Sequence, residues 1–433
     1  MDEREKSPVV IVGAGVAGIT CAIDLHAAGL DVLILEQNET AGGRIRSQRH
    51  PDGYLIDRGF QVILDAYPAL RRHVTLSTIE PQAFDAGALV WSGKRRVPLL
   101  DPLRHPSSLL RDLTAPVLTG GDRLRLIRLA LRTWRARWDT AADAATGASA
   151  LSALHAAGFS DRFIERFARP FWGGILLDRS LATSDGPLLF TFKMFLQGRA
   201  VLPAAGVQAV PDHLASQLPK GAIRYRQPVE ELVRSDRGVT GVRVGSQVIP
   251  ASAVVIATDP PALHRLTGGE PPEREGVGCT TVYLAGERDP GIGKRLVLDG
   301  TGKLAVNHLA PLSTVAPDYA PPGRHLLAAV VLAGSPGAGL DDAALMRRVL
   351  EETAQILGHA VDDWTPLTAV RVPFSLSAQP PGIYEHLPES RTATPGLYLA
   401  GEAIADSSLN GAIASGERAA SAVLGDRRAA ART

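Results

Sequence analysis

The fold is decided by the stretch Val9-Val-Ile-Val12-Gly13-Ala-Gly15-Val-Ala-Gly18. Four consecutive apolar residues are typical of a short strand buried on both faces of a parallel sheet, and the glycines follow it directly. Residues 19–28 are rich in helix formers, Gly29 suits a helix C-terminus, and the apolar run Val32-Leu-Ile-Leu35 indicates a second strand. Residues 9–35 therefore predict a strand-helix-strand unit.

The glycine spacing suits a bound phosphate. Three glycines in this spacing give a tight turn, a backbone that a pyrophosphate can approach, and close packing of helix on sheet. The helix N-terminus adds free N–H groups and the positive end of its dipole. A glycine turn in an unrelated α/β fold is the alternative interpretation. The predicted phosphate contacts are Gly13, Gly15, Val16, Ala17 and Gly18.

An acidic residue follows the second strand. Glu36 can accept hydrogen bonds from both hydroxyls of an adenosine ribose, and a carboxylate at this place disfavours a 2′-phosphate. Gln37, the next residue, is a further predicted contact. The glycines and the acid together favour a dinucleotide.

Composition excludes several classes of function. The chain has 433 residues, 45% of them hydrophobic, and 46 basic against 45 acidic residues, so it can form substantial cores and carries no net charge that would attract nucleic acid. Cys21 and Cys279 make neither a disulfide framework nor a zinc pattern, and we expect no metal site. A charged N-terminus without a long apolar run leads us to expect a cytoplasmic protein with no transmembrane segment.

A second glycine element, Gly42-Gly43-Arg44-Ile-Arg-Ser47, follows Glu36. Paired glycines let the backbone pass close to a ligand, and an arginine can meet a phosphate or the flavin end of a dinucleotide. The order of glycine turn, acid and GGR element resembles the flavin amine oxidase and phytoene desaturase superfamily, which includes protoporphyrinogen-oxidase-like proteins. The resemblance implies an FAD-dependent oxidoreductase.

The resemblance continues along the chain. Gly59-Phe60-Gln61 follows a family motif that approaches the isoalloxazine ring. Residues 227–232 and 254–259 are similar to the family's middle FAD segment, which implies contacts at Val229 and Ala257.

The last segment that carries the resemblance lies near the C-terminus. Leu397-Tyr-Leu-Ala-Gly401-Glu402 and residues 408–416 are similar to the family's closing segment, in which a Gly-Glu pair lies beside the pyrophosphate and a helix start points at the flavin. Such a helix end would stabilise negative charge on a reduced flavin. The implied contacts are Gly401, Glu402, Asn410, Gly411 and Ala412.

These segments imply an α/β fold, with a doubly wound Rossmann-type FAD-binding domain interleaved with an α+β substrate domain. We expect the discontinuous FAD-binding domain in residues 1–70, 199–262 and 385–433, and the substrate domain with a mainly helical insert in residues 71–198 and 263–384. Apolar periodicity predicts helices over 122–138, 151–168, 183–197, 207–218, 341–357 and 411–424, and strands over 223–225, 229–233, 239–244, 253–257, 280–284, 304–308 and 326–332.

The closing segment departs from the amine oxidase pattern. Amine oxidases of the superfamily carry an aromatic cage residue where this chain has Ser408, so a simple cage for a small amine is not expected. The segment is closer to the desaturase and isomerase side, although Asn410 replaces the more usual acid. No cysteine lies near Gly401 or Gly411 in the sequence, so we expect FAD to be held without a covalent bond.

Four residues are candidates for the substrate pocket. Phe171 and Trp172 lie in a segment that resembles a family motif bordering the substrate, although large aromatic residues are often core. Lys193 lies among apolar residues, where a surface lysine with a buried stem is the favoured alternative. His308 could face the flavin, but a lone histidine is more often a structural residue. The catalytic residues stay unknown.

Residues 122–138 carry two stripes at helical spacing. Leu124, Ile127, Leu131, Trp134 and Trp138 form an apolar stripe, and Arg125, Arg128, Arg132 and Arg135 form a basic one. The arginines either form a solvated helix face, which we favour, or make a peripheral contact with a membrane.

The expected function is removal of two hydrogens across a C–C or C–N bond of a bulky, largely apolar or cyclic small molecule, with hydride passing to flavin N5 and reoxidation by oxygen or a quinone-like acceptor. An amine oxidase that releases hydrogen peroxide is the second candidate. A redox-neutral flavin isomerase and a non-catalytic relative that binds a prenylated partner are alternatives of other classes. The sequence does not indicate an oligomeric state.

Overall fold

Strand β1 (Val9–Val12) lies at the centre of a five-stranded parallel sheet. The computed structural model describes residues 7–100, 117–236, 238–269 and 274–432, so residues 101–116 of the expected helical insert lie outside the described part of the chain. The strand order is β10-β2-β1-β14-β20, and all four pairings are parallel. The other strands are β10 (Ile223–Arg224), β2 (Val32–Leu35), β14 (Ala253–Ile256) and β20 (Leu397–Leu399).

The register of this sheet brings distant residues to one edge. Val12 is opposite both Leu35 and Ile256, and Ile256 is opposite Leu399. Four strands therefore end at the same level. Ligands of parallel α/β sheets bind at this edge, where the strand order switches direction.

Each face of the sheet is covered by a different layer. Alternate residues of β1, such as Val9 and Ile11, belong to one core with helices α1 (Val16–Ala27) and α14 (Leu409–Ala430). Val10 and Val12 belong to a second core. That core is shared with helix α11 (Pro260–Thr267) and the antiparallel strands β11 (Glu231–Ser235), β12 (Gly238–Val244) and β13 (Gln247–Pro250).

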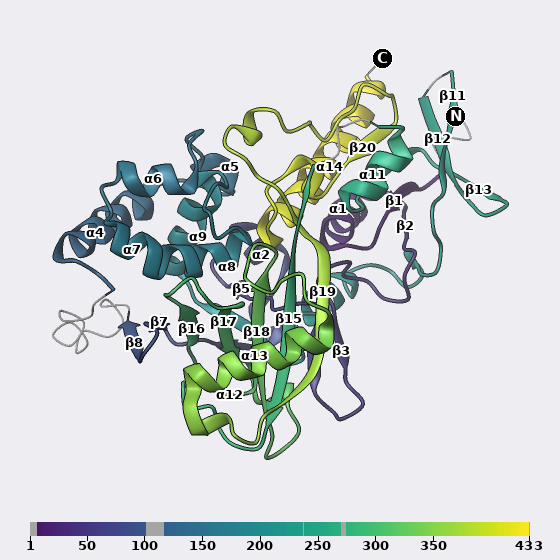
Figure 1. The fold of residues 1–433 in the computed structure, drawn as a ribbon. Coiled ribbons are helices and arrows are strands. Elements are labelled where there is room, and N and C mark those ends of the chain that lie inside the picture. The colour runs from purple at the N-terminus through teal and green to yellow at the C-terminus, as the bar shows by residue number, and fades with distance from the viewer. Residues whose placement is uncertain (1–6, 101–116, 237, 270–273, 433) are drawn as a thin grey trace.

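Helices from the two ends of the chain pack directly on each other. Figure 1 shows the purple helix α1 beside the yellow helix α14. Small residues permit this contact: a Cβ at Gly416 would lie 2.4 Å from the Ala17 carbonyl oxygen and 2.9 Å from Thr20 Cβ, both in α1. The glycine turn and the closing segment are thereby held in a fixed relation.

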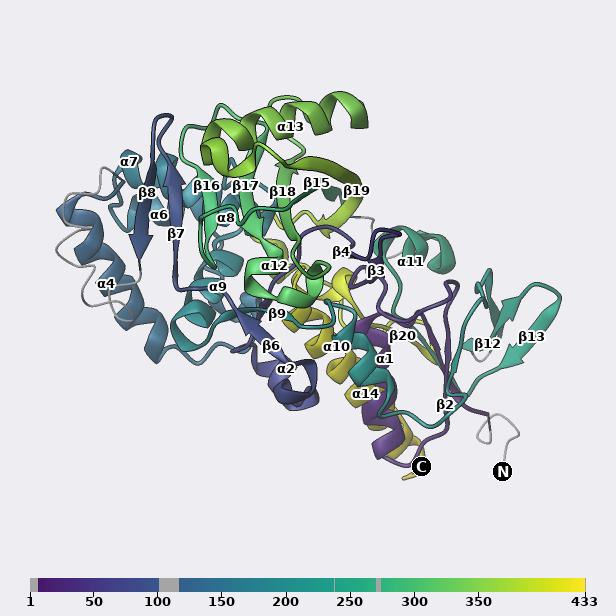
Figure 2. The ribbon, with the colours of Figure 1, turned by 90° about the horizontal axis from the view of Figure 1, so that it is seen from below.

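A second sheet, with seven strands, stands beside the first (Figure 2). Helix α13 (Asp342–Leu357) covers one face, where it packs on Val282, Leu309 and Val331. The opposite face carries Tyr283 and Ala310 and packs on Leu55 and Ile56, near the glycine elements. The order is β19 (Thr365–Ser377), β15 (Gly276–Gly286), β18 (His325–Leu332), β17 (Val306–Pro311), β16 (Leu296–Asp299), β7 (Gly87–Trp91) and β8 (Arg96–Leu100).

The helical insert packs against the β16 and β17 side of this sheet. The single helix predicted over residues 151–168 is wrong. The chain turns at Gly158, where φ is +81°, and then runs through α7 (Asp161–Phe163), a π-helical turn (Ile164–Ala168) and α8 (Arg169–Leu176) without a break. The helices of the insert are α4 (Gly120–Arg135), α5 (Ala141–Ala144), α6 (Ala150–Ala156), α7 (Asp161–Phe163), α8 (Arg169–Leu176) and α9 (Asp185–Gln197).

The remaining predicted elements are found near their expected bounds, whereas several short strands and the long strand β19 were missed. The missed strands are β3 (Ser47–Arg49), β4 (Leu55–Asp57), β5 (Ile63–Leu64), β6 (Pro81–Ala83), β7, β8, β9 (Ala200–Pro203), β13, β16 and β19. Further short helices, outside the insert, are α2 (Pro68–His73), α10 (Ala209–Ala215) and α12 (Leu312–Val315). Within the described ranges, no helix combines the length and apolarity needed to cross a bilayer.

Gly416→Ala tests the close packing of α1 on α14. The new methyl group would overlap backbone atoms, so we expect the free energy of unfolding in urea to fall by about 1–3 kcal/mol. Gly425→Ala, in the same helix, is the matched control. A Cβ at Gly425 meets only the end of the Arg391 side chain, at 3.7 Å. This control should gain up to about 1 kcal/mol; equal effects of the two variants would contradict the packing argument.

Candidate cofactor and active site

The N-terminus of α1 is open for an anion. Gly15 is its N-cap, no side chain of the described residues caps it, and its first turn carries no acid. Helices α4, α6, α7, α11, α13 and α14 are instead capped by Ser, Thr or Asp side chains. Because uncapped first-turn N–H groups and the helix dipole favour an anion, this end of α1 fits a phosphate.

Glycines from three segments leave space beside this turn. A Cβ at Gly15 would have only the Ala257 carbonyl oxygen near it, at 4.0 Å, and one at Gly43 only Gly15 Cα, at 3.6 Å. A Cβ at Gly401 would meet nothing closer than 3.7 Å. The Gly42 amide donates to the Ala14 carbonyl oxygen at 2.8 Å, which joins the two glycine elements. Together, these backbones form a cradle without side chains, as a pyrophosphate requires.

Glu36 lies at the sheet edge beside the cradle, and it is buried. Its Oε2 accepts from the Ala14 amide at 2.8 Å, and its Oε1 accepts from the amide and the side chain of Asn38 at 2.8 and 2.6 Å. A carboxylate offers about four acceptor positions, so about one stays free. Accepting both ribose hydroxyls, as we expected, therefore requires the Asn38 side chain to turn away.

An ion pair connects the second glycine element with the closing segment. Arg44 Nη1 pairs with Glu402 Oε2 and donates to the Ser375 carbonyl oxygen at 2.9 Å. Glu402 is 4% exposed and Arg44 is 36% exposed, and Glu402 Oε1 also accepts from the Ser377 amide. Arg44 and Glu402, both predicted cofactor contacts, are thus direct partners.

Arg274 is a residue of this region that the sequence did not indicate. Its Nη1 donates to the Glu402 carbonyl oxygen at 2.6 Å, and its Nη2 donates to the Ala378 carbonyl oxygen at 2.9 Å. It therefore fixes the backbone of the closing segment against the end of β19. A single arginine beside a loop rich in proline carries no motif, so only the structure could reveal it.

The segment from Asp57 to Gln61 is anchored below the cradle. The Tyr283 hydroxyl donates to the Asp57 carbonyl oxygen at 2.8 Å, and the Ser47 and Tyr319 hydroxyls donate to the Asp57 carboxylate at 2.5 and 2.8 Å. Burial raises the pKa of Asp57 to about 6, although these hydrogen bonds act in the opposite direction. Gln61 Nε2 donates to the Arg44 carbonyl oxygen at 2.9 Å, so this segment lies against the second glycine element.

The middle segment lies beside the same sheet edge. The Ala257 amide donates to the Val12 carbonyl oxygen at 2.9 Å, and the Ala257 carbonyl oxygen would lie 2.9 Å from a Cβ at Gly13, where φ is +102°. The Gln227 amide donates to the Glu36 carbonyl oxygen at 2.8 Å, and Val229 follows two residues later. Both predicted contacts of this segment are therefore close to the first βαβ unit.

The start of α14 is built from Ser408 to Ala412. Ser408 is the N-cap, and its Oγ accepts from the Gly411 amide at 2.9 Å. The Asn410 side chain is buried; its Oδ1 accepts from the Ala69 amide and its Nδ2 donates to the Asp139 carbonyl oxygen. Asn410 thus joins α14 to α2 and to the insert, so a cofactor contact there would fall to the backbone, at Asn410, Gly411 or Ala412.

Aromatic side chains form a ladder along α7, the π-helical turn and α8. The rings of Phe159, Phe163, Phe167 and Phe171 follow one another with centroids 4.6, 5.6 and 5.1 Å apart. Trp172 packs edge-on against Phe171 and is 2% exposed. Trp172 is therefore a core residue, and Phe171 is the more accessible of the two candidates.

His308 lies on the face of the second sheet opposite α13, with its ring 5.3 Å from that of Phe60. Asn307 is oriented by Arg179, which donates to its Oδ1 at 2.8 Å, and its Nδ2 donates to the Pro170 carbonyl oxygen at 2.9 Å and lies 3.0 Å from His308 Nδ1. His308 Nδ1 is therefore the acceptor, which leaves the proton on Nε2.

The Nε2–H group of His308 is a buried donor. It has no hydrogen-bond partner among the residues that the structure describes. Burial lowers the pKa of His308 to about 4, so the ring is neutral at physiological pH. Gly174 is required beside this ring, because a Cβ there would lie 2.9 Å from His308 Nδ1.

Lys193 is not the surface lysine that we favoured. Its side chain is 6% exposed, and its Nζ donates to the Trp138 carbonyl oxygen at 2.9 Å. Desolvation lowers the pKa of Lys193, although Asp139 and Asp143 act against this. The side chain joins α9 to the connection between α4 and α5, so its observed role is structural.

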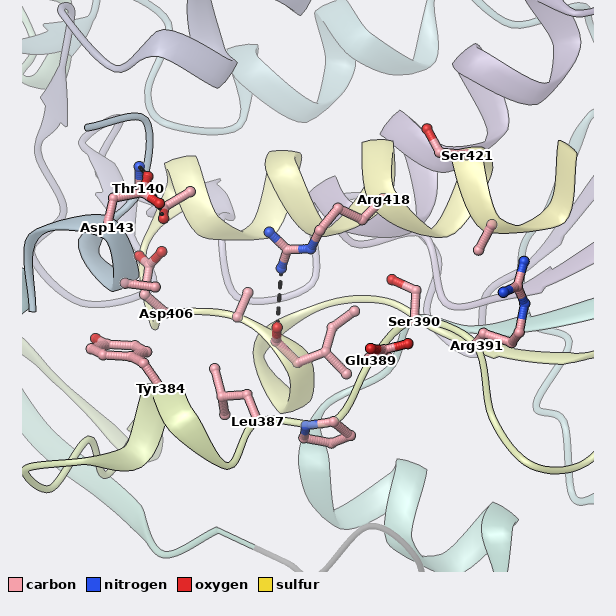
Figure 3. A pocket seen from close by; sticks show the side chains of 15 residues that line it. Thr140, Asp143, Tyr384, Leu387, Glu389, Ser390, Arg391, Asp406, Arg418 and Ser421 are labelled. Carbon is pink, nitrogen blue, oxygen red and sulfur yellow. Dashed lines mark hydrogen bonds between the residues drawn. The ribbon is translucent and has the colours of Figure 1, made fainter. Parts of the chain in front are cut away.

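One cavity of about 630 Å³ lies beside α14 and is lined by residues other than the predicted cofactor contacts (Figure 3). It is bordered by Tyr384, Asp406 and Arg418, and Arg418 Nη2 donates to the Ile404 carbonyl oxygen at 3.0 Å. Sequence reasoning did not indicate this cavity.

Cys279 is closer to the site than the sequence suggested. Its Sγ lies 3.5 Å from Ser375 Oγ, and the carbonyl oxygen of Ser375 is the one that accepts from Arg44. Burial raises the pKa of the Cys279 thiol, which disfavours the nucleophilic thiolate. Cys21 is buried within α1.

The parallel sheet, the open helix N-terminus and the cradle of three glycine segments define a dinucleotide-binding α/β protein. The family described as flavin containing amine oxidoreductase matches residues 16–424. The chain belongs to this family.

Its relatives include enzymes for different substrates. A phytoene dehydrogenase of Streptomyces griseus is 27% identical over 381 residues, which cover 73% of this chain and 71% of the relative. An oxidoreductase of Methanosarcina mazei has a similar structure, with a TM-score of 0.73 and 17% identity over 96% of this chain and 99% of the other. Cyclohexylamine oxidase of Brevibacterium oxydans IH-35A has a TM-score of 0.66 and 19% identity over 98% and 99% of the two chains. The α/β fold expected from the sequence is confirmed.

Glu402→Gln tests the ion pair between the glycine element and the closing segment. The variant keeps the hydrogen bond from the Ser377 amide but leaves Arg44 without an anion. Because Arg44 is more than one-third exposed, we expect the free energy of unfolding to fall by only about 1–2 kcal/mol, together with a lower ratio of flavin to protein absorbance. Glu231→Gln, in the exposed pair with Arg243, is the control and should change stability by less than about 0.5 kcal/mol.

Asp57→Asn tests the buried carboxyl group. Because folding raises its pKa from 3.8 to about 6, the folded protein binds this proton more tightly than the unfolded chain. The resulting stabilisation is complete below pH 3.8 and is lost as the pH rises through 6. The free energy of unfolding of wild type, measured in urea, should therefore fall by about 3 kcal/mol over this pH range relative to that of the variant. The exposed Asp52→Asn should retain the wild-type profile, and a wild-type profile for Asp57→Asn would contradict the shift.

Proposed function

We propose that the chain binds FAD without a covalent bond. The first turn of α1, with Gly15, Gly43 and Gly401, would hold the pyrophosphate, and Glu36 the ribose. When bound, the flavin supplies the oxidising end that takes two electrons from the substrate. Non-covalent binding is supported by the burial of Cys21 and by the raised pKa of the Cys279 thiol.

We further propose that the substrate is a bulky, largely apolar or cyclic molecule that loses two hydrogens. One observation carries this proposal: Ser408, where amine oxidases have a cage aromatic, caps α14 and hydrogen-bonds to Asp406. Its hydroxyl is already hydrogen-bonded at the start of the helix, so Ser408 cannot form the aromatic wall of a cage for a small amine. An aromatic side chain at this position would also remove the cap of the helix.

The chain's own residues would position such a substrate. Phe60 and Phe171 offer apolar surface near the second sheet and the insert, and the neighbouring aromatic core excludes water. The His308 Nε2–H group is a donor held in a fixed direction by Asn307. It is buried, so a polar atom of the substrate would reach it only after neighbouring side chains move. Removal of a hydride from a neutral amine requires no protein base. Dehydrogenation of a C–C bond also releases a proton, which would pass to solvent.

Anaerobic titration of the purified protein tests the proposed function. A polyene or a cyclic alkene should bleach the visible flavin band without added reductant, and acid precipitation should release intact FAD into the supernatant. Primary amines are the comparison. If amines alone bleach the band and peroxide forms in air, the protein is an amine oxidase.

Three further outcomes test the class of protein and the mode of flavin binding. Conversion of the substrate without net bleaching would indicate a redox-neutral isomerase. A colourless protein that takes up no FAD would contradict the cofactor proposal and leave a binding role. Flavin that stays with the precipitated chain would contradict non-covalent binding.

A further inference from the structure

The outer face of helix α4 is apolar. Leu124, Ile127, Leu131 and Trp134 are 50, 56, 56 and 58% exposed. They account for four of the six exposed large hydrophobic side chains among the described residues; the other two, Tyr225 and Val248, lie on or beside β10 and β13. Their spacing of three, four and three residues places them in one line along the helix. Single exposed apolar residues are ordinary, but a continuous stripe marks an interaction surface.

A basic stripe runs beside the apolar one. Arg128, Arg132 and Arg135 are exposed and follow the same helical spacing one residue further on. Within the described part of the chain, none of the three forms an ion pair. The single acid of the helix, Asp122, is buried on its inner face. The outer face therefore combines apolar surface with uncompensated positive charge, although the whole chain is nearly neutral.

The inner face of α4 is firmly attached, so the outward orientation of these stripes is fixed. Asp122 accepts from the Thr119 and Ser160 hydroxyls at 2.6 Å each, which joins the start of α4 to α7. Thr133, on the same inner face, is fully buried, and the helix packs on α9. The helix lies at the edge of the insert, at the opposite end of the molecule from β11 to β13 (Figures 1 and 2).

We propose that α4 binds the surface of a bilayer that contains anionic lipids. The apolar stripe would enter the boundary between headgroups and acyl chains, and Arg128, Arg132 and Arg135 would meet lipid phosphates. A basic face beside an apolar face, with a tryptophan among the apolar residues, is complementary to such an interface rather than to the neutral surface of a second copy of this chain. This inference does not depend on the proposed substrate.

Sedimentation with lipid vesicles tests the proposal. The full protein should bind to vesicles of phosphatidylcholine mixed with phosphatidylglycerol. It should bind much more weakly to vesicles of phosphatidylcholine alone. The double variant Leu131→Ser/Trp134→Ser should lose roughly tenfold or more in vesicle affinity. The triple variant Arg128→Gln/Arg132→Gln/Arg135→Gln should lose roughly fivefold for each arginine on anionic vesicles, and the loss should shrink in high salt. Val248→Ser, an exposed apolar residue on β13, should bind like wild type.

Other occupants of the stripe would give different results. If wild type fails to bind anionic vesicles, the proposal is overturned. It is also overturned if the double variant converts a dimer to a monomer in light scattering, because a second copy would then cover the stripe. A thermal unfolding temperature several degrees lower in the double variant than in Val248→Ser would also overturn the proposal, because the stripe would then be buried in the folded chain. An unchanged unfolding temperature with lost vesicle binding supports the proposal.

Discussion

The register of the parallel sheet is the constraint on which the site depends. Because β1, β2, β14 and β20 end at one level, Gly13, Glu36, Ala257 and Gly401 come to one edge from segments hundreds of residues apart. A shift of one residue in any pairing would turn the alternating core residues of that strand toward the wrong layer, since Val9 and Val10 belong to different cores. Packing of the two apolar layers thus fixes the position of the polar residues.

Much of this first domain could be predicted from the sequence because its signals are local. The apolar run Val9–Val12, the glycine spacing and the acid after β2 lie within one βαβ unit, and strand and helix periods there agree with the tertiary fold. The strands between residues 47 and 100 were missed because they are short, and β19 was missed because its burial does not follow a simple alternation. Their pairing is decided by distant partners, which no local pattern records.

The contacts of the site were harder to predict than its location. The motifs indicated Arg44 and Glu402 separately, but the ion pair between them spans most of the chain. Arg274 and Asn307 act through backbone carbonyls and a neighbouring ring, and such contacts leave no residue pattern. Lys193 was misjudged because a charged residue in an apolar helix is ordinarily at the surface, and only the position of the Trp138 carbonyl oxygen explains its burial.

The π-helical turn Ile164–Ala168 has a consequence for how this chain can vary. In a regular α-helix, residues four apart drift steadily around the axis, so Phe159, Phe163, Phe167 and Phe171 could not stay in contact along one line. A π turn is wider and compensates for this drift. Deleting a single residue there would rotate α8 as a rigid unit and carry Gly174 away from His308. The number of residues in this short segment therefore sets the angle at which the insert packs on the second sheet.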